Sequence, residues 1–204
     1  MQAINDLPPA TRKRLVQLEE LLKSWSGEKI TSAKICELTG WKDSLVRHDL
    51  WLIGNKARGW KNGYDTAALL ETIRKALHGE VQTDSENVCI AGLGRLGAAL
   101  LDDALVEGSR FVIKAGFDSN VNRVEILRSS FPLYPAAEMN WVIKQEKITL
   151  AILAVVDKDA QAMCDRLVKA GIKGIVNMTR MVLSIPEGIK IENLSVLNAL
   201  KMIS

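Results

Sequence analysis

The ten residues Val88-Cys-Ile-Ala-Gly-Leu-Gly-Arg-Leu-Gly97 join a short apolar run to a G-x-G-x-x-G motif. The apolar run predicts a buried strand, and the glycines follow at the point where that strand ends. We expect a helix over residues 96–106 after them. A strand, a glycine turn and a helix in this order favour a site for the pyrophosphate of a dinucleotide.

The three glycines have separate expected roles. Gly92 permits the tight turn, Gly94 lets a pyrophosphate approach the backbone, and Gly97 lets the helix pack against the sheet. The helix N-terminus is expected to attract the phosphates. The alternative is that the glycines serve only the turn. The predicted cofactor-binding residues are Gly92, Leu93, Gly94, Arg95, Leu96, Gly97 and Asp118.

Asp118 ends the next predicted strand, residues 111–117, and lies 21 residues after Gly97. A carboxylate there would accept hydrogen bonds from the adenosine ribose and repel a 2′-phosphate, which favours NAD(H) over NADP. The nearby Arg123 leaves NADP open, and Asp118 has the alternative role of capping the following helix. Arg95 either contacts a phosphate or points to solvent.

The remaining pattern of the C-terminal half alternates strands and helices, which predicts a mostly parallel sheet covered on both faces. The fold class is therefore α/β, with a winged-helix domain, a Rossmann-like domain and a C-terminal helix. The strands are expected at 149–156 and 174–176, with a helix at 159–170 between them. The predicted parts are residues 1–80, 81–192 and 193–204, for DNA, NAD(H) and the C-terminal helix respectively.

The N-terminal part has the order of elements that is typical of a winged helix. Helices are predicted over 10–25, 33–38, 43–53 and from Asp65 to His78, and Asn62-Gly63 is a hairpin signal before the last one. Asp43 is the expected N-cap of the third helix. In such a module the third helix enters the major groove and the hairpin contacts the DNA backbone.

Basic residues are in excess only in this part. Residues 1–80 have 13 Lys and Arg against 10 Asp and Glu, and the rest of the chain has 14 of each. A local basic stripe favours a partner with a phosphate backbone. Arg47 is the best candidate for a base or phosphate contact, the alternative being an ion pair with Asp43 or Asp49. The predicted DNA-binding residues are Ser44, Arg47, His48, Lys56, Arg58 and Lys61.

Several classes of protein are disfavoured. Three widely spaced cysteines and two histidines argue against a zinc site or a disulfide framework and favour a cytoplasmic protein. The apolar runs are too short for a membrane span, and the N-terminus lacks a signal-peptide pattern. No set of catalytic residues is visible in the Rossmann half, so we expect no enzyme and no metal, and a nucleotide that is sensed rather than consumed.

The chain resembles the Rex-type redox-sensing transcriptional repressors of bacteria. The resemblance covers nearly its whole length and is strongest at 165–177, in the segment Asp165-Arg-Leu-Val-Lys-Ala-Gly-Ile-Lys-Gly-Ile-Val-Asn177. It implies a homodimer with a C-terminal helix exchanged between subunits, which binds double-stranded operator DNA. It also implies that NADH favours a form that leaves the operator and that NAD⁺ permits binding.

The sequence departs from the family pattern on one side of the expected nucleotide site. Val156-Asp-Lys158 stands where the family has a Pro-Ala turn, and Met178-Thr-Arg180 stands where it has a proline. The C-terminal helix is also short. Asp157, Lys158 and Arg180 could form a polar site for something other than nicotinamide. The alternative function is therefore a divergent DNA-binding regulator that is redox-insensitive or senses another adenine nucleotide.

Overall fold

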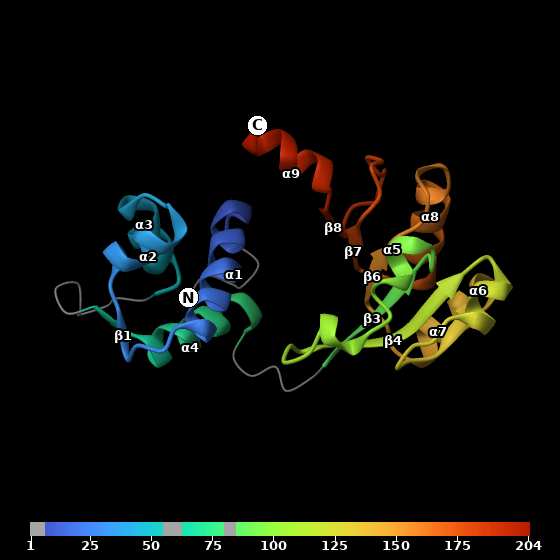
Figure 1. The fold of residues 1–204 in the computed structure, drawn as a ribbon, viewed down its shortest axis with the longest axis horizontal. Coiled ribbons are helices and arrows are strands. Elements are labelled where there is room, and N and C mark those ends of the chain that lie inside the picture. The colour runs from blue at the N-terminus through green and yellow to red at the C-terminus, as the bar shows by residue number, and fades with distance from the viewer. Residues whose placement is uncertain (1–6, 55–62, 80–84) are drawn as a thin grey trace. The chain divides into compact units, whose positions relative to one another are not determined.

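The computed structural model describes residues 7–54, 63–79 and 85–204. Its internal contacts divide the chain into two compact units, Met1–Thr83 and Asp84–Ser204. Figure 1 shows a helical unit in blue and teal and an α/β unit in green to red.

The N-terminal unit packs its helices around one apolar core, which includes Leu15, Ile35, Leu50 and Ile73. Thr31 caps the second helix by accepting the Lys34 N–H, at 3.1 Å. Strands β1 and β2 pair antiparallel. The elements are α1 (Pro9–Ser24), β1 (Lys29–Ile30), α2 (Ser32–Thr39), α3 (Asp43–Leu52), β2 (Tyr64–Asp65) and α4 (Thr66–His78).

The N-terminus of α3 differs from the sequence-based expectation. Asp43 is the first residue of α3 rather than its N-cap; Lys42 holds that position without a side-chain hydrogen bond. The Asp43 carboxylate instead accepts hydrogen bonds from the side chains of Ser32 and Arg47, and these bonds lower the pKa of Asp43. The predicted hairpin tip includes Asn62, which lies outside the described residues.

The C-terminal unit is built on a six-stranded sheet whose neighbours all run parallel, in the order β5-β4-β3-β6-β7-β8. The order reverses direction between β3 and β6, which is the topological switch point where Rossmann folds bind their ligands. The strands are β3 (Glu86–Ala91), β4 (Phe111–Asp118), β5 (Leu133–Pro135), β6 (Leu150–Leu153), β7 (Gly174–Asn177) and β8 (Lys190–Asn193).

The expected helix over residues 96–106 is wrong, because α5 (Arg95–Ala98) is a single turn. After it the Asp102 carboxylate accepts the Ala104 N–H at 3.0 Å, a local bond that competes with continued helix. No described helix is both long and apolar enough to cross a membrane. The other helical elements are η2 (Asp103–Leu105), α6 (Val121–Ile126), η3 (Ala136–Glu138), α7 (Met139–Gln145), η4 (Asp157–Asp159), α8 (Ala160–Ala170) and α9 (Val196–Ile203).

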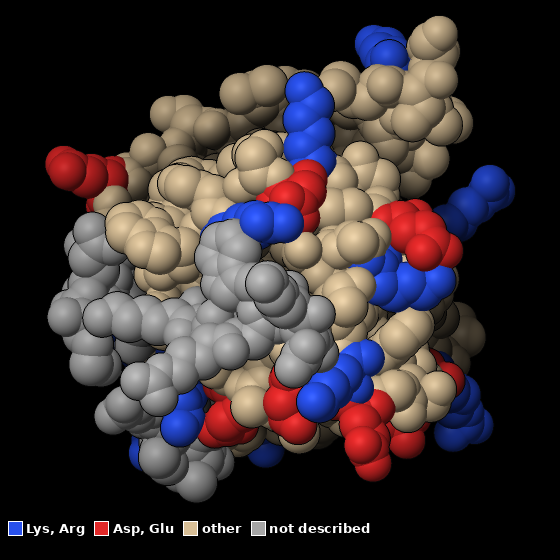
Figure 2. All heavy atoms as spheres, turned by 90° about the vertical axis from the view of Figure 1, so that its left-hand side faces the viewer, with Lys and Arg blue, Asp and Glu red and all other residues tan. Residues whose placement is uncertain are grey.

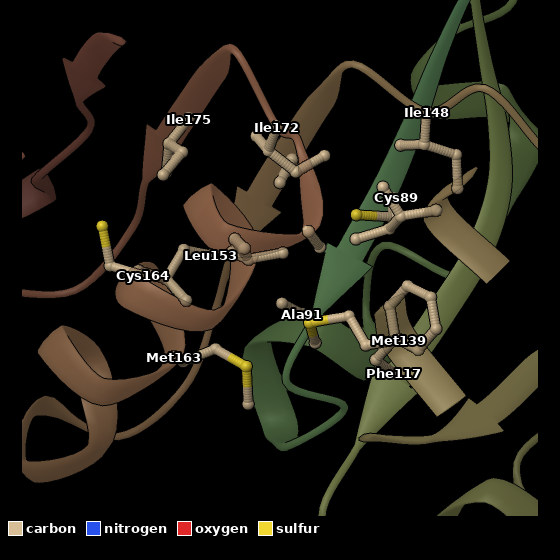
Figure 3. Packing of buried hydrophobic residues seen from close by; sticks show 14 of the residues in the cluster. Cys89, Ala91, Phe117, Met139, Ile148, Leu153, Met163, Cys164, Ile172 and Ile175 are labelled. Carbon is tan, nitrogen blue, oxygen red and sulfur yellow. The ribbon is translucent and has the colours of Figure 1, made fainter. Parts of the chain in front are cut away.

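One face of the sheet is covered by α7 and α8. Figure 3 shows the side chains that fill this layer, with Cys89 and Leu153 on the strands and Met139 and Met163 on the helices. Side chains at alternate positions of each strand share this face. Close packing here fixes where β3, β6 and β7 end, and the candidate site lies at those ends.

The other face is covered only in part, which corrects the expectation of a sheet covered on both sides. Ile90, Ile113 and Phe131 pack there in a smaller cluster over β3 and β4. Beside them an apolar groove of about 430 Å³ runs across β3, β6, β7 and β8. Its lining includes Val88, Val106, Leu150, Ile152, Val176 and Ile191. The one-turn α5 is too short to cover it.

Candidate functional site

The glycine loop between β3 and α5 is fixed by two close backbone contacts. Gly92 has a φ of +97°, and a Cβ there would lie 2.8 Å from the carbonyl oxygen of Ala154. A Cβ on Gly97 would lie only 1.8 Å from the carbonyl oxygen of Gly92. Both positions therefore require glycine, and they press the loop against the chain that leaves β6.

Gly94 differs from the other two glycines because a Cβ there would meet no atom within 4 Å. It is the N-cap residue of α5 and has no side chain to pair with the first N–H groups of that turn. An open backbone surface with N–H groups fits a pyrophosphate. Because α5 is one turn long, the N–H groups supply this attraction with little help from a helix dipole. Arg95 and Leu96 are exposed beside it.

Asp118 lies at the end of β4 and holds the glycine loop from the other side. Its side chain is buried, Oδ2 accepts the Leu93 N–H at 2.7 Å, and Oδ1 accepts the Asn120 N–H at 2.7 Å. Arg123 Nη1 lies 3.2 Å from Oδ2. The cap of α6 is Asn120, so the alternative role of Asp118 as the helix cap is wrong. Three donors leave a carboxylate further acceptor capacity.

The second half of the sheet has a charged pair at the same edge. Asp157 follows β6 and Arg180 follows β7. The carboxylate accepts the Arg180 backbone N–H at 3.0 Å and its Nε at 2.8 Å, and Nη2 lies 2.6 Å away. These hydrogen bonds, the backbone one first, lower the pKa of Asp157. The residues that were expected to form a polar site are thus partly brought together, while Lys158 is exposed.

Asn177 lies at the candidate site, although no role there is predicted for it from the sequence. It is completely buried at the end of β7, and its Oδ1 accepts the Thr179 N–H at 3.0 Å and the Thr179 hydroxyl at 2.7 Å. Its Nδ2 donates to the Met181 carbonyl at 2.8 Å and to Asn193 Oδ1 at 2.9 Å. The amide thereby fixes the loop that carries Arg180. A polar residue closing a buried strand was the available signal.

In the N-terminal unit, the orientation of α3 depends on a buried carboxylate. Asp49 accepts the Thr11 hydroxyl at 2.8 Å and two guanidinium donors of Arg14, Nε at 2.5 Å and Nη2 at 2.8 Å. Asp49 is an expected alternative partner of Arg47, but its carboxylate instead binds Thr11 and Arg14 of α1. Its place next to the buried Leu50 was the signal that it faces inward.

The opposite side of α3 is exposed and holds Ser44, Arg47 and His48. Arg47 Nε lies 2.6 Å from Asp43 Oδ2, which is the ion pair expected as the alternative to DNA contact. The exposed Trp51 stacks loosely near His48, with ring centroids 6.4 Å apart. Lys56, Arg58 and Lys61 lie outside the described residues.

Charges of both signs share the visible face of the described N-terminal unit. Figure 2 shows Lys and Arg side chains interspersed with Asp and Glu on its visible face. Arg47 forms an ion pair with Asp43, and Arg14 forms one with Asp49. The charges of Arg47 and Asp49 are therefore both offset by a neighbouring opposite charge. Among the described residues no three His, Cys, Asp or Glu side chains meet in a way that could hold a metal ion.

Known proteins match both units of the chain. A protein-family model described as CoA binding domain matches residues 83–181. The redox-sensing transcriptional repressor Rex of Limosilactobacillus reuteri is 32% identical over 199 residues, which cover 96% of this chain and 91% of that protein. The repressor of the same name from an Exiguobacterium species is 33% identical over 192 residues, covering 92% and 86%.

Solved structures agree with the sequence relatives. The crystal structure of RSP, a Rex-family repressor, has a TM-score of 0.83 and 27% identity, and the match covers 97% of this chain and 91% of that chain. RSP in complex with β-NADH gives a TM-score of 0.83 at 27% identity, covering 97% and 92%. RSP in complex with β-NAD⁺ and operator DNA gives 0.82 at 26% identity, covering 97% and 90%.

Proposed function

The chain belongs to the Rex family of redox-sensing transcriptional repressors, and from this premise we propose that it represses transcription by binding operator DNA under the control of NADH and NAD⁺. The supporting observation is the match over 97% of the chain to RSP in complex with β-NAD⁺ and operator DNA. The N-terminal unit supplies the DNA contact and the C-terminal unit supplies the dinucleotide site. A repressor of this kind acts in the cytoplasm.

The dinucleotide is proposed to lie across the carboxyl ends of β3 and β6. Gly94 and the first N–H groups of α5 would face its pyrophosphate, and Arg95 and Leu96 would border it. Asp118 would receive the adenosine ribose hydroxyls while it holds the Leu93 N–H. The bound dinucleotide supplies the redox state, and the protein supplies only differential affinity for its two forms.

The DNA is proposed to meet α3 through Ser44, Arg47 and His48 and to meet the wing through Lys56, Arg58 and Lys61. The Asp43–Arg47 pair keeps the guanidinium at the surface in a defined place. A base edge or phosphate then competes with Asp43 for the same donors. Exposed pairs of this kind are worth about 0–1 kcal/mol, so the exchange costs little.

We also propose that the functional form is a homodimer whose subunits exchange α9. The helix has apolar side chains with no cover among the described residues: Val196, Leu197, Leu200, Met202 and Ile203 are all exposed. The apolar groove on the sheet is a second such surface. Apolar surfaces of this kind mark an interaction site.

The same residues support a regulator rather than an enzyme. Asp118 is paired with Arg123 near the end of β4, and Asp157, which follows β6, is paired with Arg180, which follows β7. A group that is held in a pair is poorly placed to take a proton from a substrate.

The test uses a fluorescent duplex selected from a random library for binding by the full-length protein. Anisotropy is followed while NADH, NAD⁺ or ATP is added. Release by NADH, with binding kept in NAD⁺, is the expected result. Indifference to all three ligands would contradict redox control and support a redox-insensitive regulator, and release by ATP alone would indicate a sensor of another adenine nucleotide.

A further inference from the structure

The ion pair between Asp157 and Arg180 lies in the loops after β6 and β7, next to the glycine loop between β3 and α5. β6 pairs with β3 on one side and with β7 on the other. A Cβ on Gly92 would lie 2.7 Å from Val155 Cγ1, so the glycine loop touches the chain two residues before Asp157. In a fold made of two mononucleotide-binding halves, Asp118 belongs to the first half and this pair belongs to the second.

The loops that carry Asp157 and Arg180 are each held by neighbouring backbone and side-chain contacts. Asp157 opens η4 directly ahead of α8, and Arg180 is bound to it through its backbone N–H as well as its side chain. The buried Asn177 fixes the same loop through Thr179 and Met181. Two charges are therefore presented from a rigid loop, with Arg180 76% and Asp157 31% exposed at the side chain.

The two forms of the proposed ligand differ by one charge in the half that would face this pair. The oxidised nicotinamide ring is a cation and the reduced ring is neutral. A carboxylate nearby favours the cation and a guanidinium disfavours it, and within one ion pair the two effects largely cancel. The neighbours Lys158 and Asp159 are exposed, and their opposite charges add no net charge to this turn.

Resting on the proposed function, we propose that the Asp157–Arg180 ion pair keeps the nicotinamide end of the site electrically neutral, so that neither charge by itself biases the ratio of NADH affinity to NAD⁺ affinity. Removal of either partner leaves the other charge uncompensated. The two single substitutions therefore change the ratio in opposite directions. A merely structural role would weaken both ligands alike.

The experiment measures NADH, NAD⁺ and ADP-ribose binding by calorimetry to the full-length protein and its variants. Arg180→Gln is expected to shift the affinity ratio toward NAD⁺ by about three- to tenfold, and Asp157→Asn to shift it toward NADH by a similar factor. The double variant should return to within about twofold of the wild-type ratio. Lys173→Ala, an exposed cation at the opposite end of β7, is the matched control and should leave the ratio unchanged.

ADP-ribose separates the possible failures, because it carries the adenosine and pyrophosphate without the nicotinamide ring. If the wild-type protein binds none of the three ligands, the proposed function itself is overturned. If all three bind but Arg180→Gln and Asp157→Asn leave the ratio unchanged, or move it in one direction, only the assignment of this pair is overturned. Retained ADP-ribose binding shows that each variant is folded.

Discussion

Single atoms distinguish the roles of the three glycines in the loop after β3. Gly92 and Gly97 are required because a Cβ would collide with backbone, 2.8 Å from Ala154 and 1.8 Å from Gly92 respectively. Gly94 has space for a side chain and yet faces the surface where a phosphate would lie. A substitution at Gly94 therefore tests binding without testing folding.

Gly94→Asp is expected to abolish NADH binding, because it places a carboxylate against the pyrophosphate. The free energy of unfolding should change by no more than about 0.5 kcal/mol, since the position is open. Fluorescence titration with NADH and thermal unfolding measure the two effects. Gly97→Ala is the contrasting variant: its main effect should be a lower free energy of unfolding, because its Cβ would collide with the Gly92 carbonyl oxygen. Wild-type NADH affinity in Gly94→Asp would remove this loop from the site.

Arg47→Ala is expected to weaken operator binding by about 1–3 kcal/mol if the guanidinium reads a base. The measurement is a competition between the selected operator and a scrambled duplex of equal length. Lys75→Ala removes an exposed cation of the same unit, paired with Glu71 on α4, and serves as the control. A loss of the same size on both duplexes would assign Arg47 to the phosphate backbone instead.

At the level of elements, α3 is attached to α1 by the pair of Asp49 and Arg14 as well as by apolar contacts. Arg14→Ala leaves the Asp49 carboxylate of α3 without its counter-ion, and this carboxylate is almost fully buried. The expected loss is roughly 2–4 kcal/mol of unfolding free energy, at the low end of values for broken buried pairs because Arg14 is partly exposed. Urea unfolding measures it.

The control for this prediction is the surface pair of Lys34 and Glu37 on α2, which are 2.7 Å apart. Lys34→Ala should cost less than about 1 kcal/mol, because exposed pairs contribute little. Equal losses of unfolding free energy in the two variants would show that the Asp49–Arg14 pair stabilises the protein no more than an exposed surface pair does.

The packing of α1 against α4 should depend on pH through Glu19. Burial alone would raise the pKa of this carboxyl, but hydrogen bonds from His78 and Arg74 and the nearby Lys23 bring it below the usual 4.5. The stabilisation is therefore fully present above pH 4.5 and is lost as pH falls through the lower, folded-state pKa. Between pH 6 and 3 the free energy of unfolding should fall more steeply with decreasing pH in the wild type than in Glu19→Gln. An equal pH dependence in the two proteins would contradict this role of Glu19.

The elements that could be predicted are those whose signals are local. The glycine loop follows β3 as expected, because the steric requirement for its glycines involves residues close in sequence. The helix after the loop could not be predicted, since Leu96, Leu100 and Leu101 continue a helical spacing beyond the point where α5 ends.

Candidate-site residues could be predicted where a local sequence pattern identifies them. They could not be predicted where their role depends on partners from distant elements. Asp118 was found from its spacing, but its bond to the Leu93 N–H joins residues 25 apart in the chain. Asn177 and Asp49 act through partners brought in by other elements. Their hydrogen bonds reach Asn193 and Thr11, which no local pattern relates to them.

At the level of the whole molecule, two apolar surfaces lack a partner among the described residues. They are the exposed face of α9 and the groove across β3, β6, β7 and β8. Deleting residues 195–204 is expected to convert the dimer to a monomer in sedimentation velocity, because the exchanged helix is lost. Operator affinity should fall by at least about tenfold, since one subunit contacts one half-site only.

The matched control for the deletion is Lys201→Ala, which removes an exposed charge from the same helix and keeps its apolar residues. It should remain dimeric. Retained ADP-ribose binding shows that the shortened protein is still folded. A stable dimer after deletion would move the interface away from α9.

The exposed apolar face of α9 also has a genetic consequence if it pairs two copies of the chain. A subunit that is damaged only in α3 keeps α9 intact and still joins an undamaged subunit. Such mixed pairs would have one working recognition helix and would hold the operator poorly. Alleles of Arg47 should therefore be dominant over the wild-type allele, whereas alleles that remove α9 should be recessive.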